Sequence, residues 1–182
     1  MRRINICAIL IILFPFTSEC QNLNHLYDDL FDGRIFIYTK PLTTFHFERY
    51  SFRGDFEEHM DSLRYQEIIT NSKNPDSSFW TDQEAKDVII VNEDETRLKW
   101  KKIKPKFNNI DKKQEERYRT EIYFYNKKPR ERLIYRFSRP IFDNKKEFAV
   151  IQWRYSKVGY GLRVYKLRNG ERKELFTIET YF

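Results

Sequence analysis

The feature of this sequence that most constrains its fold is the last third, where apolar and polar residues alternate over several consecutive runs. Such alternation is typical of strands with one face on a core, because successive side chains of a strand point to opposite faces. In Phe148–Tyr155, for example, Ala149, Ile151, Trp153 and Tyr155 share one face. The pattern predicts strands over Thr120–Tyr125, Leu133–Ser138, Phe148–Tyr155, Tyr160–Leu167 and Lys173–Tyr181.

The segments between these runs carry turn residues, which favours a meander of about five antiparallel strands. Asn169-Gly170 is a strong hairpin signal, because both residues tolerate the positive φ of a type I′ turn. Pro140 has no backbone N–H to donate, so we expect a strand to end there or to lie at a sheet edge. Asp143–Lys146 and Ser156–Gly159 are expected to be loops.

The first half of the chain favours helices with shorter strands between them. A stripe of Leu23, Leu26, Tyr27 and Leu30 predicts an amphipathic, core-facing helix over Asn22–Asp32. Helices in the first half and strands in the second predict an α+β fold, with N-terminal helices packed on a curved antiparallel sheet. Further strands are predicted at Arg34–Thr39, Thr43–Phe52, Val88–Val91 and Arg97–Ile103, a helix at Asp55–Ser72, a helix from the capping-box pattern Thr81–Glu84 to about Asp87, and a helical turn at Gln114–Arg119.

Residues 1–20 are predicted to be a secretory signal peptide. Two arginines open the segment, and the apolar stretch that follows, Ile4–Phe16, is shorter than the roughly 20 residues of a membrane-spanning helix. Cys20 stands where a bacterial lipoprotein carries its acylated cysteine, although Glu19 is not the small residue expected before it. Ordinary cleavage after Cys20 is the alternative. Both readings predict one mature domain, 21–182, in the periplasm or anchored by lipid to the cell envelope.

Cysteine content and charge limit the chemistry of the mature domain. Of the 2 cysteines, Cys7 lies within the predicted signal peptide, so no disulfide is expected and the core must hold the fold. The formal net charge is +7, with basic and acidic residues interspersed. A basic balance in an exported protein favours anionic surfaces such as lipid head groups or polysaccharide over nucleic acid, which we do not expect as a partner.

The sequence shows no catalytic motif, and we predict no cofactor and no metal. Glu57 and Asp61 would share a face of the predicted helix, but a zinc site needs His or Cys ligands at matched spacing. There is no G-x-S-x-G motif, and the 5 glycines are too scattered for a phosphate-binding loop. Two carboxylates that meet only in space, as in glycoside hydrolases, stay open as an alternative.

Two groups of residues are candidates for ligand contact. The basic and aromatic stretch Lys99–Phe107 is interpreted first as a lysine-lined edge strand and second as a contact for anionic lipid or glycan. Aromatic residues of the last third could line a ligand-binding face, although aromatic strands more often belong to a core. The candidates are Lys99, Lys101, Lys102, Lys104 and Lys106 for an anionic surface, and Trp153, Tyr155, Tyr160 and Tyr165 for a ligand.

One stretch carries a resemblance to other proteins. Ser138–Phe142, with the sequence Ser-Arg-Pro-Ile-Phe, is followed by the strand Ala149–Ile151 and the pair Tyr160-Gly161. This order resembles a group of uncharacterised exported proteins from Bacteroidota, over about Tyr135 to Gly170. Many of them have a Cys- and Gly-rich turn where Ser156–Gly161 here lacks cysteine. The resemblance implies an envelope location and assigns no catalytic residue.

We therefore expect an exported, non-enzymatic binding or interaction domain. The alternative is a hydrolase-type enzyme whose site assembles only in three dimensions. A deep pocket with two or more carboxylates or histidines favours the enzyme, whereas a filled sheet without a cleft favours the binding domain.

Overall fold

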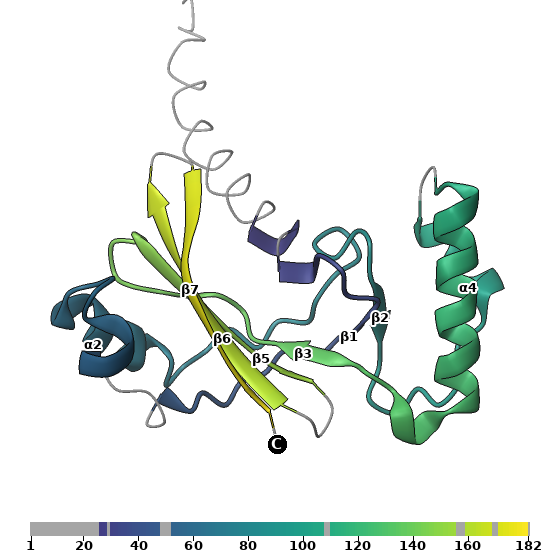
Figure 1. Cartoon of the computed structure of the whole chain (residues 1–182), viewed down its shortest axis with the longest axis horizontal. Coiled ribbons are helices and arrows are strands. Elements are labelled where there is room, and N and C mark those ends of the chain that lie inside the picture. The colour runs from purple at the N-terminus through teal and green to yellow at the C-terminus, as the bar shows by residue number, and fades with distance from the viewer. Residues whose placement is uncertain are drawn as a thin grey trace, which may run out of the picture.

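The computed structural model describes residues 26–28, 30–47, 52–107, 110–155, 159–168 and 171–181. At its centre is one seven-stranded sheet with the order β2-β1-β3-β5-β6-β7, in which β4 pairs with β5 (Figure 1). The strands are β1 Phe36–Tyr38, β2 Ile89–Val91, β3 Tyr135–Phe137, β4 Ile141–Phe142, β5 Phe148–Tyr155, β6 Gly159–Arg168 and β7 Glu171–Tyr181. The α-helices include α2 Ser62–Asn71, α3 Trp100–Ile103 and α4 Lys112–Lys127, and short turns of π- or 3₁₀-helix lie at η2 Phe52–Phe56, η3 Lys104–Lys106 and η4 Pro129–Glu131.

The fold is mixed α+β, as the sequence predicted, but the sheet is not wholly antiparallel. β1 runs parallel to both of its neighbours, β2 and β3, whereas the pairs β3–β5, β4–β5, β5–β6 and β6–β7 are antiparallel. Parallel neighbours need long crossovers, and here α2 lies between β1 and β2 in the chain, while α3 and α4 lie between β2 and β3. Strands of three residues carry too short a pattern to reveal their direction.

The C-terminal strand prediction is confirmed for β3, β5, β6 and β7, each within two residues of its predicted bounds. β1 and β2 also lie inside their predicted ranges, Arg34–Thr39 and Val88–Val91. The remaining member of the predicted meander, Thr120–Tyr125, is wrong, because these residues belong to α4. The fifth antiparallel strand is instead β4, which follows Pro140 and pairs with the start of β5.

Helix α4 forms because capping and a helical apolar spacing act together. The Asp111 side chain accepts a hydrogen bond from the N–H of Gln114 at 2.7 Å, and the Gln114 side chain accepts one from the N–H of Asp111. Tyr118, Ile122 and Tyr125, spaced four and three residues apart, form the buried side of the helix. The alternation within Thr120–Tyr125 is therefore a local coincidence inside a longer helical period.

Two further strand predictions are wrong over their described residues. Arg97–Ile103 contains α3 instead, where the Trp100 ring stacks with those of Phe107 and Tyr118 and so favours a helical turn beneath α4. In Thr43–Phe52, the described residues before Phe47 are irregular, and 48–51 lie outside the described part of the chain.

Both predicted helix starts in the middle of the chain need correction. The helix expected at Asp55 begins at Ser62, because Asp61 is its N-cap and accepts a hydrogen bond from the N–H of Arg64 at 2.9 Å. The predicted capping box at Thr81–Glu84 is only half formed: the Glu84 carboxylate accepts hydrogen bonds from the N–H and the hydroxyl of Thr81, but the N–H of Glu84 donates to the carbonyl of Thr81 rather than to its hydroxyl. The residues after this box form turns rather than a helix. Only a few residues separate this box from β2, so the chain must become extended almost at once.

One face of the sheet packs on the N-terminal segment and on Trp80. Leu26, Tyr27 and Leu30 are buried there, as their spacing predicted, and Gly33 follows with a positive φ of 70°. Residues 22–25 and 29 of the predicted helix, the predicted signal peptide with Cys20, Asn169-Gly170 and residues 156–158 lie outside the described residues. The sheet residues of this core are Ile37, Phe137, Ala149, Ile151, Trp153, Tyr155 and Tyr165.

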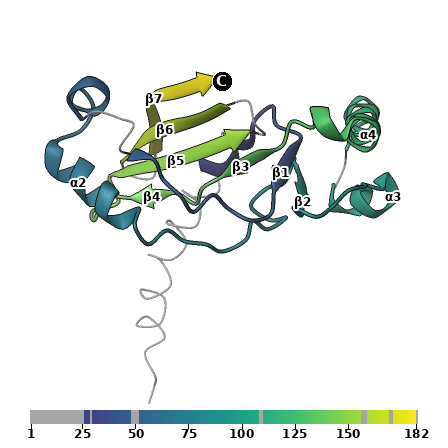
Figure 2. The ribbon, with the colours of Figure 1, turned by 90° about the horizontal axis from the view of Figure 1, so that it is seen from below.

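The opposite face carries two separate apolar clusters, each covered by its own helix. α2 contributes Tyr65 and Ile68 to the cluster over β4, β5 and β6, and α4 packs on the cluster over β1 and β2. Figure 2 shows α2 at one end of the molecule and α4 at the other, with the strands between them. Among the described residues, no helix is both long enough and apolar enough to span a bilayer.

The Ser-Arg-Pro-Ile-Phe motif has a structural role. The Ser138 hydroxyl is buried and accepts a hydrogen bond from the N–H of Gln152 at 2.9 Å, which ties the end of β3 to β5. Arg139, only 5% exposed, forms an ion pair with Glu84 and stacks its guanidinium 4.0 Å from the centroid of the Trp80 ring. The motif therefore fastens the segment around residue 80 to the sheet.

Candidate functional site

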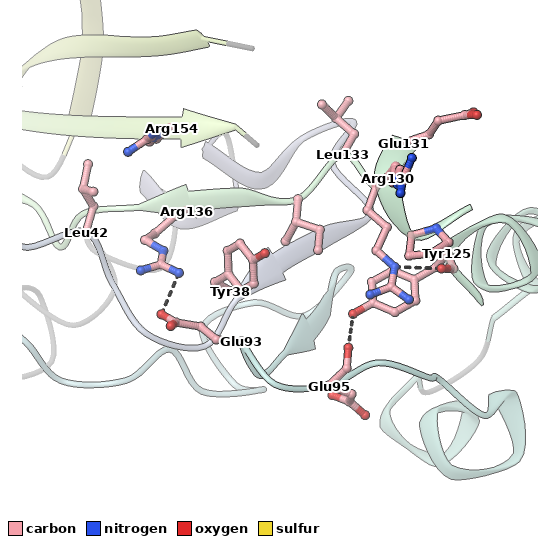
Figure 3. Close-up of a pocket in the computed structure, with 13 residues that line it drawn as sticks. Tyr38, Leu42, Glu93, Glu95, Tyr125, Arg130, Glu131, Leu133, Arg136 and Arg154 are labelled. Carbon is pink, nitrogen blue, oxygen red and sulfur yellow. Dashed lines mark hydrogen bonds and ion pairs between the residues drawn. The ribbon is translucent and has the colours of Figure 1, made fainter. Parts of the chain in front are cut away.

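A cavity of about 870 Å³ lies on the sheet face that carries the two apolar clusters (Figure 3). Strands β1, β3 and β5 contribute to its floor, and the connection from α4 through η4 to β3 forms one side. Because α2 and α4 cover opposite ends of this face, neither helix fills the space between them. The charged residues that line the cavity are Arg130, Arg132, Arg136, Arg154, Glu93, Glu95 and Glu131.

Strand alternation places two arginines in the floor of this cavity. Arg136 lies between Tyr135 and Phe137, whose rings pack toward the opposite face of the sheet. Arg154 likewise lies between two buried aromatic residues of β5. Turning the apolar neighbours toward their core forces both guanidinium groups onto the cavity face.

The register of β3 and β5 then makes these arginines direct neighbours. Arg136 is paired with Arg154 across the antiparallel ladder. Directly opposed residues on one face have Cβ atoms roughly 4.5–5.5 Å apart, and like charges in such a pair are destabilising. This cross-strand arginine pair, Arg136 and Arg154, places two positive charges side by side in the lining of the cavity.

The two members of the pair have different surroundings. Arg136 forms an ion pair of 2.6 Å with Glu93 and lies over the Tyr38 ring, 4.7 Å from its centroid. Figure 3 shows the Glu93 contact as a dashed line, and Arg154 carries none. Within the described part of the chain, the Arg154 side chain has no carboxylate or hydrogen-bond partner. One guanidinium of the pair is therefore free to meet a ligand.

Arg132 also lines the cavity, but its guanidinium group is held by contacts within the protein. Its guanidinium donates hydrogen bonds to the carbonyl oxygens of Tyr125 and Thr96, at 2.8 and 2.6 Å, and lies 3.9 Å from the centroid of the Tyr125 ring. The Tyr125 hydroxyl donates to the carbonyl of Glu95 at 2.6 Å, and burial raises the pKa of this phenol. Arg132 and Tyr125 thus fix the wall of the cavity beside α4.

The cavity also contains carboxylates, which bears on the enzyme alternative. Glu93 is paired with Arg136, and Glu131 lies 2.7 Å from the ammonium group of Lys128. Glu95 is the third glutamate of the lining. The sequence criterion for an enzyme, two or more carboxylates in one pocket, is met in number, while two of the three are neutralised by basic neighbours.

The aromatic residues singled out from the sequence do not form one ligand-binding face. Trp153, Tyr155 and Tyr165 are buried in the core beneath the N-terminal segment. Tyr160 lies on the other face, beside Arg154 in the β5–β6 register, and packs at the margin of the α2 cluster. Only Tyr160 is therefore on the same side of the sheet as the cavity.

The lysines of 99–106 do not line an edge strand, because this segment is α3 followed by η3. Lys104 and Lys106 are paired with Glu115 at 2.9 Å and Asp82 at 2.7 Å. Burial lowers the pKa of Lys106, against the opposing effect of its Asp82 contact. The exposed members of this group are Lys99, Lys101, Lys102 and Lys104.

The acidic cluster at Glu57–Asp61 does not share a helix face, because these residues precede α2 and Asp61 caps it. His59 stacks on Phe176 of β7 at 4.7 Å between ring centroids. No group of three or more His, Cys, Asp or Glu residues in the described ranges is arranged to hold a metal ion.

Sequence reasoning did not single out Arg136 or Arg154. The alternation already placed each of them opposite an aromatic core face, but their adjacency depends on the β3–β5 register. The sequence signal for this pair is an arginine opposite the aromatic core face in each of two strands predicted to be neighbours.

Comparison with known proteins adds no functional information. No protein-family model matches the chain, and neither the curated proteins nor the solved structures contain a match. The site is therefore interpreted from its own chemistry.

Proposed function

We propose that this protein is a non-enzymatic binding domain that holds an acidic oligosaccharide segment in the arginine-lined cavity. The observation that carries the proposal is the cross-strand pair Arg136 and Arg154. Two like charges in directly opposed positions destabilise the sheet. An anionic ligand that bridges the two guanidinium groups would offset their repulsion. Guanidinium groups bind carboxylate and phosphate oxygens through two parallel hydrogen bonds, which favours such a ligand.

The shape of the site favours a saccharide chain over a membrane surface. A volume of about 870 Å³ falls in the range of small-molecule sites, roughly 300–1,000 Å³. Arg136 and Arg154 both line this hollow, and both side chains reach solvent, so a segment of a saccharide chain can contact the two guanidinium groups together. The exposed Lys99, Lys101 and Lys102 are outside the lining of this cavity.

The test is a calorimetric titration of the mature protein with trigalacturonate at low ionic strength. We expect wild-type protein to bind and Arg154→Gln to bind at least about tenfold more weakly, since a hydrogen bond to a charged group contributes about 1.5–3 kcal/mol. Neutral maltotriose should not bind.

The matched control is Arg168→Gln, which removes the same charge from an exposed position of β6 outside the cavity lining. It should bind like wild type, apart from a small effect of net charge. Equal weakening by the Arg154 and Arg168 substitutions would contradict a defined site. Binding to vesicles of anionic phospholipid but not to trigalacturonate would replace the saccharide with a membrane surface.

A hydrolase is the second candidate, and the observation that favours it is the three glutamates of the cavity lining. Glycoside hydrolysis needs two carboxyl groups on either side of the scissile bond. Release of new reducing ends from trigalacturonate, abolished by both Glu93→Gln and Glu95→Gln, would establish the enzyme. The binding proposal predicts no reducing ends.

We also propose that the domain acts outside the cytoplasm, at the cell envelope. The proposal rests on the charged start and apolar stretch of residues 1–20, together with the motif resemblance at Ser138–Phe142. Mass spectrometry of the mature N-terminus tests it, because acylated Cys20 and free Gln21 differ in mass. Recovery of the chain with Met1 attached, in the cytosolic fraction, would contradict export.

A further inference from the structure

One member of the cross-strand arginine pair already binds a carboxylate of the protein itself. Arg136 is in contact with the Glu93 carboxylate, whose oxygen lies 2.6 Å from a terminal guanidinium nitrogen. Arg154, directly opposite, has no such partner among the described residues. A carboxylate of this chain thus already lies where an acidic ligand would bind one of the two arginines.

We infer that Glu93 is a resident competitor: it occupies the Arg136 half of the pair, and a carboxylate of the ligand displaces it. This inference rests on the proposed function of the cavity and names the anionic group of its ligand. Arg154 makes the first contact with the incoming carboxylate. Arg136 then exchanges the carboxylate of Glu93 for one of the ligand.

The Glu93–Arg136 contact is weak enough to be exchanged. The side chains are 51% and 27% exposed, so water and salt screen their attraction. Exposed ion pairs contribute little to stability, because the charges are solvated and both side chains lose conformational freedom. The contact can therefore break without disturbing the core.

The position of Glu93 allows this movement. It lies in a turn just after β2, and the hydrogen bonds that hold this end of the strand belong to other residues. The N–H of Thr39 donates to the carbonyl of Val91 at 2.9 Å, and the N–H of Glu95 donates to the carbonyl of Asn92 at 3.1 Å. The Glu93 side chain can rotate away while the backbone of the turn stays in place.

A second effect must be separated from displacement. Removing any negative charge from the cavity raises the local positive potential and attracts an anion more strongly. Glu131 provides the matched control, because it also lines the cavity but forms its ion pair with Lys128 rather than with the arginine pair. Glu93→Gln and Glu131→Gln change the net charge equally.

The experiment compares trigalacturonate affinity of wild type, Glu93→Gln and Glu131→Gln by calorimetry at low salt. The ligand no longer has to break the Glu93–Arg136 ion pair in Glu93→Gln. The free energy of an exposed ion pair corresponds to about two- to fivefold tighter binding for this variant. Glu131→Gln should gain clearly less. Because salt already weakens the Glu93 contact, the advantage of Glu93→Gln should shrink as ionic strength rises.

The outcomes separate this inference from the proposed function. Equal affinity gains for the two glutamine variants, or no gain for Glu93→Gln, would overturn the role of Glu93 while leaving the site intact. Failure of Arg154→Gln to weaken binding would overturn the site itself. Circular dichroism of each variant confirms that the fold is retained.

Discussion

Substitution of Arg139 by Met tests how the sheet holds the segment around Trp80. The guanidinium donates one hydrogen bond to the carbonyl of Ser78 at 3.0 Å and another to the carbonyl of Phe79 at 2.5 Å. It also forms an ion pair with Glu84, so one side chain fixes three points of this segment. Met fills a similar volume but makes none of these contacts.

The expected loss is large because Arg139 is buried. Removing one member of a buried ion pair costs about 3–5 kcal/mol, since the remaining charge is left without a partner. The Glu84 side chain is 24% exposed and can recover part of its hydration, so we expect the lower end, about 3 kcal/mol. That loss is a considerable part of a total stability of about 5–15 kcal/mol.

Urea denaturation followed by circular dichroism measures this free energy of unfolding, with Glu84→Gln and the double variant completing a cycle. Burial disfavours the charged form of Glu84, but hydrogen bonds from Arg139 and Thr81 outweigh it and lower the pKa of this carboxyl. Its contribution is therefore present above the unfolded pKa of about 4.3 and lost as pH falls through the lower folded pKa. Arg139→Met should reduce that acid sensitivity, while the part due to the Thr81 hydrogen bonds stays.

The cycle should be strongly non-additive, because the two side chains are direct partners. A loss below about 1 kcal/mol for Arg139→Met, which is the range of exposed ion pairs, would refute the reasoning. Additive losses for the two single variants would refute it as well.

Two other substitutions test packing and electrostatics at separate places. In Gly161→Ala the new methyl group would overlap the buried ring of Trp153, so we expect a loss of about 1–3 kcal/mol or more in urea denaturation. Hydrogen bonds from Lys104 and then Arg119 lower the pKa of Glu115 to about 2, so this carboxylate stabilises the fold above its unfolded pKa of about 4.3 and ceases to do so as pH falls toward 2. Glu115→Gln should flatten that part of the stability–pH profile, and an unchanged profile would contradict the assignment.

The long strands were predictable because their pattern is local. β5 has the predicted bounds, Phe148–Tyr155, since this run is rich in apolar, β-branched and aromatic residues and is bounded by turn residues on both sides. Thr120–Tyr125 was mispredicted because a window of six residues cannot distinguish strand alternation from the 3.6-residue period of α4, which becomes visible only from Asp111 onward. The direction of β1 depends on crossovers, which no local pattern encodes.

The candidate site was predictable only in part, for the same reason. The sequence placed Arg136 and Arg154 on polar strand faces, but the register that makes them neighbours is a tertiary property. The predicted aromatic site does not form, because Trp153, Tyr155 and Tyr165 are buried in the core beneath the N-terminal segment. Glu93 came to the site through β2, whose position beside β1 the sequence did not reveal.

The most direct test of the central claim follows the arginine side chains themselves during ligand binding. Nuclear magnetic resonance resolves the Nε–H signal of each arginine in the mature protein as trigalacturonate is added. The account predicts that the signals of Arg136 and Arg154 shift together and saturate at one dissociation constant, while that of Arg168 stays in place. Binding that leaves the Arg154 signal unchanged, or no binding at all, would contradict it.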